Sequence, residues 1–190
     1  MKKFRIRITY NSPVILTFSL ISLIVVFVGT YIDFTVVEKY FMVYRAPLTD
    51  PFTYFRFVSY IFGHSGWSHF LSNFSYILLL GPLVEEKYGS ERLLSMIGIS
   101  ALVGGLANFI FFPNVALCGA SGIVFMLIIM SSVTSVSRGD IPITLILVIV
   151  IYLAEEIYNA FFIVDNISQF THIIGGLCGA FFGMKYGRGR

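Results

Sequence analysis

One serine and one histidine of this chain stand in settings that favour nucleophilic chemistry. Ser121 lies in the small-residue segment Gly119-Ala120-Ser121-Gly122, and His172 lies in an apolar stretch near the end of the chain. Glycine lets a second backbone approach closely, and a histidine within hydrogen-bond reach can accept the proton of a serine hydroxyl. Taken singly, a small-residue segment more often packs helices together, and a lone histidine is as often a hydrogen-bonded residue inside a bundle.

A second group of polar side chains could stabilise negative charge. His69 and Asn73 are four residues apart, so a helix places both side chains on one face. A histidine ring nitrogen and an asparagine amide both donate hydrogen bonds, as do the free backbone N–H groups at the start of a helix. Such donors suit an oxyanion. A structural polar pair between two helices is the alternative interpretation.

The residues after His172 carry glycine at every fourth position. These glycines are Gly175, Gly179, Gly183 and Gly187. A spacing of four keeps them on one helical face, and small residues on such a face let two membrane helices pack with close backbones. His172 precedes Gly175 by three residues and therefore leans toward the same face.

The charges indicate which elements must position these residues. Of the 190 residues, 57% are hydrophobic and 12% are charged, about half the charged share of an ordinary soluble domain. A membrane-spanning helix needs about 20 apolar residues, and the charges leave gaps of that length. The chain is therefore predicted to be an all-α membrane protein forming one domain over residues 1–190. Its six predicted transmembrane helices cover about 13–32, 68–88, 91–112, 119–137, 142–162 and 169–187.

The basic residues predict an orientation for these spans. With the N-terminus inside, the outer segments hold only Lys39, Arg45 and Arg56, and the inner segments hold the remaining 10 of the 13 lysines and arginines. This bias obeys the positive-inside rule. We expect a multi-pass protein of a prokaryotic plasma membrane with both termini cytoplasmic. Ser121, His172 and His69 then open their spans at the outer side, and the scattered basic residues give no support for a nucleic-acid partner.

The segment between the first two predicted spans is unusually aromatic. Residues 31–67 contain 12 aromatic side chains among 37 positions, with charges interleaved. Rings with polar edges favour the headgroup boundary, so this segment is predicted to lie in the outer membrane interface. A simple aromatic belt is an overlapping interpretation. Cys118 and Cys178 both stand in apolar surroundings and are interpreted as small packing side chains.

In these motifs the sequence resembles the rhomboid family of intramembrane serine proteases over roughly residues 60–187. The segment around Ser121, the pair His69 and Asn73, and His172 followed by Gly175 occur in the family's order and at its span positions. The resemblance implies a six-helix bundle. It also implies that Ser121 attacks the scissile carbonyl and that His172 takes its proton.

The resemblance also implies the supporting groups. His69, Asn73 and the backbone N–H of Ser121 would hold the oxyanion, with Gly119 and Ala120 beside the substrate. Phe125 takes the place of an aromatic that packs on the catalytic histidine, where a tyrosine is familiar in the family. The implied substrates are transmembrane segments of other proteins, cut near their outer ends, and no cofactor or metal is implied.

The sequence departs from the family pattern at two places. The first outer segment has no Trp-Arg pair, which many members carry, so we expect it to pack by other contacts. Glu155 and Glu156 fall within the fifth predicted span, where carboxylates are costly. They would face water, be protonated, or lie at the interface if that span ends early.

Two other functions remain possible for such a chain, and two other protease classes have less support. A catalytically inactive relative that binds transmembrane helices would share the fold, although the intact Ser121 and His172 argue against it. A small transporter could use Glu155, Glu156 and the histidines as a polar path. A metalloprotease lacks the His-Glu-x-x-His motif, and an aspartyl protease lacks an aspartate deep within a span.

Overall fold

The computed structural model describes residues 9–133, 143, 146–147, 150 and 166–187. These residues form helices and no strand; the only β-type pairing among them is an isolated antiparallel bridge between Val43 and Leu117. Most of the fifth predicted span, including Glu155 and Glu156, lies outside the described residues. The helices are α1 Pro13–Tyr31, α2 Phe34–Tyr40, α3 Pro51–Ser59, the 3-10 turn η1 Tyr60–Phe62, α4 Trp67–Tyr88, α5 Ser90–Phe111, α6 Ser121–Val133 and α8 Asn166–Gly187.

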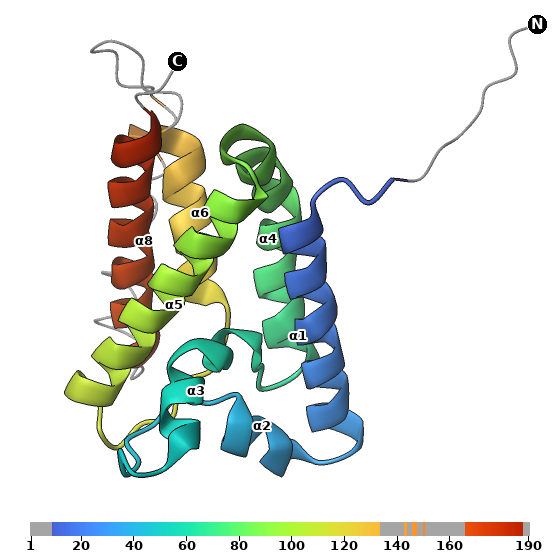
Figure 1. Ribbon diagram of the computed structural model, residues 1–190, viewed down its shortest axis with the longest axis vertical. Helices are drawn as coiled ribbons and strands as arrows, with labels where there is room; N and C mark the ends of the chain where they lie inside the picture. Colours follow the sequence, from blue (N-terminus) through green and yellow to red (C-terminus); the bar gives the residue numbers. More distant parts are fainter. Residues whose placement is uncertain (1–8, 134–142, 144–145, 148–149, 151–165, 188–190) are drawn as a thin grey trace, which may run out of the picture.

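The long helices run along one axis, and the short ones lie across one end. Figure 1 shows α1, α4, α5, α6 and α8 side by side, with α2 and α3 together below them. Helices α4, α6 and α8 all begin at the end that α2 and α3 occupy, whereas α1 and α5 begin at the opposite end (Figure 1). The starts of α4, α6 and α8 therefore lie at one end of the bundle.

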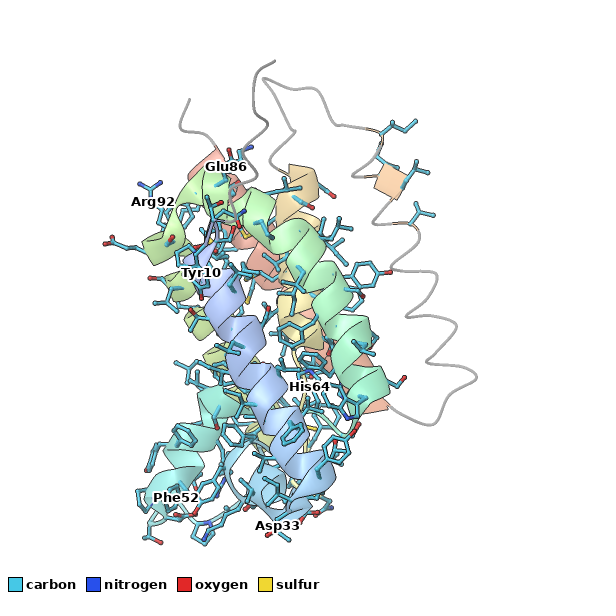
Figure 2. All side chains as sticks on the ribbon, turned by 90° about the vertical axis from the view of Figure 1, so that its right-hand side faces the viewer. Tyr10, Asp33, Phe52, His64, Glu86 and Arg92 are labelled. Atoms are coloured by element: carbon cyan, nitrogen blue, oxygen red, sulfur yellow. The ribbon has the colours of Figure 1, made fainter. Side chains whose placement is uncertain are left out.

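The surface of the bundle is suited to lipid. Helices α1 and α5 are long and apolar enough to cross a membrane. Large apolar side chains also face outward on α4 and α8, among them Leu71, Leu79 and Leu177. Figure 2 shows Glu86 and Arg92 at one end of the molecule and Asp33 at the other. Apolar flanks between polar ends are expected of an all-α membrane bundle.

The helix ends follow local capping rules. Pro13 opens α1, where its missing N–H breaks no hydrogen bond. The Asp33 carboxylate accepts from Thr35 N at 2.9 Å to cap α2. Helix α6 begins at Ser121, two residues later than the start predicted for the fourth span, because Gly119 has a φ of +126° that a helix cannot contain.

A buried carboxylate joins the start of α1 to the end of α4. Glu85 is only 4% exposed, and its two oxygens accept from Val14 N at 3.0 Å and Ile15 N at 3.1 Å. Ser90 Oγ, at the start of α5, donates to Glu85 Oε1 at 2.7 Å. The first N–H groups of a helix have no partner within that helix and carry partial positive charge. Glu85 therefore accepts hydrogen bonds from the first turn of α1, although it lies in a distant part of the chain.

An arginine organises the aromatic segment between α1 and α4. Arg56 is 2% exposed and donates to Asp50 Oδ2 at 2.9 Å and to the Lys39 carbonyl at 3.1 Å. Its guanidinium also lies 4.6 Å from the Tyr44 ring centroid. The hydrogen bond from Arg56 lowers the pKa of Asp50. The segment packs without a Trp-Arg pair, as expected. The arginine that makes its contacts follows a phenylalanine, Phe55.

Candidate active site

Helices α6 and α8 pack with their backbones in close contact. A Cβ built on Gly175 would overlap the carbonyl group of Gly122, and one on Gly179 would lie 2.5 Å from the carbonyl oxygen of Met126. A Cβ on Gly122 would approach the Thr171 methyl group at 3.2 Å. Only glycine allows the two helix backbones to approach so closely. The glycine face of α8 therefore determines where His172 lies along the first turns of α6.

The ring of His172 lies against α6. Its centroid is 4.3 Å from that of Phe125, with a tilt of 36° between the two planes. Ser121 is one helical turn before Phe125 and on the same face of α6. The structure therefore packs Phe125 on His172 and Gly122 against Gly175, and Ser121 begins the helix that makes both contacts.

The segment that leads into Ser121 is held from both sides. Leu117 exchanges two backbone hydrogen bonds of 2.9 Å with Val43, and Gly119 N donates to the Tyr60 carbonyl at 3.0 Å. The Asn108 amide donates to the Val43 carbonyl at 3.2 Å. These contacts have no local sequence signature, because they join residues far apart in the chain. They fix the backbone turn that precedes the nucleophile candidate.

The first turn of α6 presents backbone donors that have no acceptor within the helix. The Ala120 carbonyl accepts from Ile123 N at 2.9 Å and from Val124 N at 3.0 Å. The N–H groups of Ser121 and Gly122 precede this ladder, so no helical carbonyl is available to them. Together with the positive end of the helix, they can attract an anion at the Ser121 side chain.

His69 approaches the same turn from α4. A Cβ on Gly119 would lie 2.7 Å from His69 Nε2, which places this nitrogen beside the backbone leading to Ser121. His69 also interacts electrostatically with His172. Asn73 is buried and uses its amide to donate to the His69 carbonyl at 2.9 Å, so one amide proton of Asn73 is already engaged.

His64 is a neighbour of this group to which the sequence motifs assign no role. It is 1% exposed, and Figure 2 shows it between α1 and α4. Its ring centroid lies 5.0 Å from that of His69, and its Nδ1 is 3.2 Å from the Phe62 carbonyl oxygen. Burial, together with His69, lowers the pKa of His64 to about 4. Its spacing of five residues from His69 is the only sequence signal that connects the two.

The described residues contain no cluster of three or more histidine, cysteine, aspartate or glutamate side chains able to hold a metal ion. Cys118 and Cys178 are both free thiols and half-buried. Burial raises the pKa of Cys118, which precedes α6, to about 11, so this thiol is protonated at neutral pH. Ser121, which begins α6, is the candidate nucleophile predicted from the sequence.

The chain is similar in sequence to known proteins. The Rhomboid domain model matches residues 51–189. Mouse Rhomboid-related protein 2 is 32% identical over 156 residues, which are 72% of this chain and 52% of that protein. Rhomboid protease GluP of Bacillus subtilis is 32% identical over 68% of this chain and 25% of its own length. Rhomboid protease GlpG of Haemophilus influenzae is 31% identical over 45% of this chain and 44% of its own.

The chain therefore spans about half, or less, of the length of these relatives. The matched region nevertheless includes α3 through α8, together with all the site residues described above. The family model alone covers well over half of the 190 residues. This chain belongs to the rhomboid family.

Proposed function

We propose that this protein is an intramembrane serine endopeptidase in which Ser121 is the nucleophile and His172 the general base. The packing of the His172 ring on Phe125, one turn after Ser121, carries this proposal. This packing places His172 beside the first turns of the helix that Ser121 begins. Membership of a family that includes proteins named rhomboid proteases supports the same reaction.

The reaction follows from these groups. The Ser121 oxygen attacks the carbonyl carbon of the scissile peptide while His172 takes the hydroxyl proton. His172 then gives this proton to the leaving amine, and the C–N bond breaks to leave an ester on Ser121. Water, deprotonated by His172, hydrolyses the ester and restores the serine. Phe125 limits the movement of the His172 ring during these transfers.

The negative oxygen of the tetrahedral intermediate needs donors that are already in place. We assign this role to the backbone N–H of Ser121 and to the side chains of His69 and Asn73. His69 Nε2 lies beside Gly119, and Asn73 keeps one amide proton beyond the one given to the His69 carbonyl. In a site of low dielectric, the loss of one such donor typically costs about 100-fold in kcat. Gly119 and Ala120 would line the substrate's path.

We further propose that the substrates are transmembrane segments of other proteins. The candidate site lies at the end of the bundle covered by α2 and α3, where exposed rings such as Phe52 and Tyr54 suit a membrane interface. The positive-inside rule, applied to the 10 of 13 basic residues that the sequence assigns to the inner segments, makes the opposite side cytoplasmic. Cleavage then falls near the outer end of the substrate helix, after local unwinding exposes a peptide bond.

A fluorophosphonate probe tests the nucleophile. We expect labelling of the wild type and no labelling of Ser121→Ala, with loss of cleavage of a transmembrane substrate in liposomes for both Ser121→Ala and His172→Ala. Ser132→Ala is the matched control, because Ser132 lies on the same helix and, among the described residues, its hydroxyl donates only to the Ile128 carbonyl. Equal labelling of wild type and Ser121→Ala would remove Ser121 from the mechanism.

The same preparations separate the alternatives. A protein that captures transmembrane helices but shows neither labelling nor cleavage would be an inactive relative. Solute flux in liposomes that survives Ser121→Ala would favour a transporter. Cleavage that survives His172→Ala would exclude His172 as the base.

A further inference from the structure

His69 is contacted on three sides. Ser65 Oγ lies 3.1 Å from His69 Nδ1, one turn earlier in the chain. The His64 ring meets the His69 ring at a centroid distance of 5.0 Å and an angle of 67°. The remaining nitrogen, Nε2, is the one beside Gly119. The ring is therefore oriented with Nδ1 toward the loop before α4 and Nε2 toward the turn before Ser121.

A neutral imidazole has one N–H, so its position decides which nitrogen can donate. If His69 is to donate a hydrogen bond into the candidate site, the proton must be on Nε2. Nδ1 must then accept, which requires a donor opposite it. The structure places the Ser65 hydroxyl opposite Nδ1, and a hydroxyl can donate as well as accept.

The neighbouring histidine has the opposite arrangement. His64 Nδ1 lies 3.2 Å from the Phe62 carbonyl oxygen, which can only accept. His64 must therefore carry its proton on Nδ1, and its buried Nε2 has no hydrogen-bond partner among the described residues. The carbonyl facing His64 requires the proton on its Nδ1, whereas the hydroxyl facing His69 can donate and so allows the proton of His69 to be on Nε2.

We propose that Ser65 is a positioning residue for the oxyanion site: its hydroxyl donates to His69 Nδ1, orients the ring and keeps the proton on Nε2. The proposal rests on the proposed function, since it matters for catalysis only if His69 donates to the oxyanion. Ser65 itself is exposed at the end of its loop and acts through His69.

Kinetics with three variants measure this role. Ser65→Ala removes the donor, and kcat for a transmembrane substrate should fall about fivefold to tenfold, the loss of one ordinary hydrogen bond. KM should change by less than about twofold, because the role of Ser65 is to orient His69. Ser65→Thr keeps a hydroxyl and should restore kcat to within about twofold of the wild type. Ser68→Ala, at an exposed neighbouring serine, should leave kcat unchanged.

The tautomer can be read directly, without any cleavage assay. The chain has three histidines, so a ¹⁵N-histidine-labelled sample in micelles gives three ring spin systems. His64→Asn and His172→Ala assign them. We expect His69 to carry its proton on Nε2 in the wild type and in Ser65→Thr, and the Nδ1–H form to grow in Ser65→Ala. Melting temperatures should be equal for all the Ser65 and Ser68 variants.

Two results would overturn the proposal. One is a wild-type His69 with its proton on Nδ1. The other is a Ser65→Ala variant with an unchanged His69 tautomer and an unchanged kcat. Failure of the proposed function has a different signature, because Ser121→Ala would then cleave as well as the wild type whatever the His69 tautomer is.

Discussion

The Phe125 ring packs on the His172 ring with their centroids 4.3 Å apart. One ring comes from the first turns of α6, and the other comes from α8, almost 50 residues later in the chain. The contact restricts rotation of the imidazole near the start of α6. A base held in this way loses less conformational freedom when it takes up a proton from a nearby serine.

Removal of the Phe125 ring should slow the chemistry. Aromatic pairs contribute about 0.5–1.5 kcal/mol beyond burial, so Phe125→Ala should lower kcat by about twofold to tenfold, with a smaller change in KM. Phe125→Tyr keeps the ring and should stay within about twofold of the wild type. Steady-state cleavage of a transmembrane substrate in liposomes measures both, and a wild-type kcat for Phe125→Ala would contradict the positioning role.

A side chain at position 119 should disrupt the site. Gly119 has a φ of +126°, a conformation that costs other residues about 1–3 kcal/mol. The added Cβ would also lie 2.7 Å from His69 Nε2 and displace that ring. Gly119→Ala should therefore lower kcat/KM by about 100-fold or more. Gly98→Ala, which meets only open space, is the control and should retain full activity. Equal activity of the two variants would show that neither His69 nor the turn is needed.

Glu85 should matter for stability rather than for catalysis. Glu85→Ala removes the acceptor for two N–H groups of α1 and for Ser90 Oγ, and should lower the free energy of unfolding by about 2–4 kcal/mol. Glu86→Ala, at the exposed neighbouring glutamate, should change it by less than about 0.5 kcal/mol. Denaturation in mixed micelles measures the difference. A similar stability for the two variants would show that Glu85 does not anchor α1.

Acid should weaken the fold through His64. Its pKa of about 4 in the fold is below the ordinary value of 6.5, so the unfolded chain binds the proton more readily. The stability contributed by neutral His64 is complete above about pH 6.5 and is lost as the pH falls toward 4. This loss amounts to about 3 kcal/mol. Unfolding measured from pH 7 to 4 should show it in the wild type and not in His64→Asn.

The acid effect of His64 is separable from that of the carboxylates. Hydrogen bonds from Thr35 lower the pKa of Asp33, and those from Arg56 and Phe52 lower that of Asp50. Both groups therefore stay charged through most of the range in which His64 titrates. An equal pH dependence in the wild type and in His64→Asn would assign the acid effect to other groups.

Local patterns in the sequence were sufficient to predict the long helices, but not the short helices α2 and α3. Charge-free stretches predict long apolar helices. Helices α1, α4 and α5 begin and end within two residues of the ranges that these stretches predict. Glycine at every fourth position predicts a close helix contact because the missing side chain acts sterically and locally. The contact of Gly175 with the Gly122 backbone has that cause.

Contacts between distant segments were not predictable in the same way. Glu85 looks like an ordinary charge at the end of a span, yet it caps a helix that begins about 70 residues earlier. The bridge from Leu117 to Val43 uses backbone groups, which no side-chain pattern reveals. Phe55-Arg56 does not match the Trp-Arg pattern of the family, although it is the arginine that makes the hydrogen bonds.

The carboxylate of Glu85 also imposes an order on biosynthesis. Helix α1 leaves the ribosome before α4, and its cap is encoded 71 residues after Val14. At a synthesis rate of about 5–20 residues per second, Glu85 is made about 4 to 14 seconds after Val14 and Ile15. Until α4 arrives, α1 can enter the bilayer but cannot bury its first turn against its final neighbour. Glu85 thereby makes completion of the first helix a late event in the insertion of the chain.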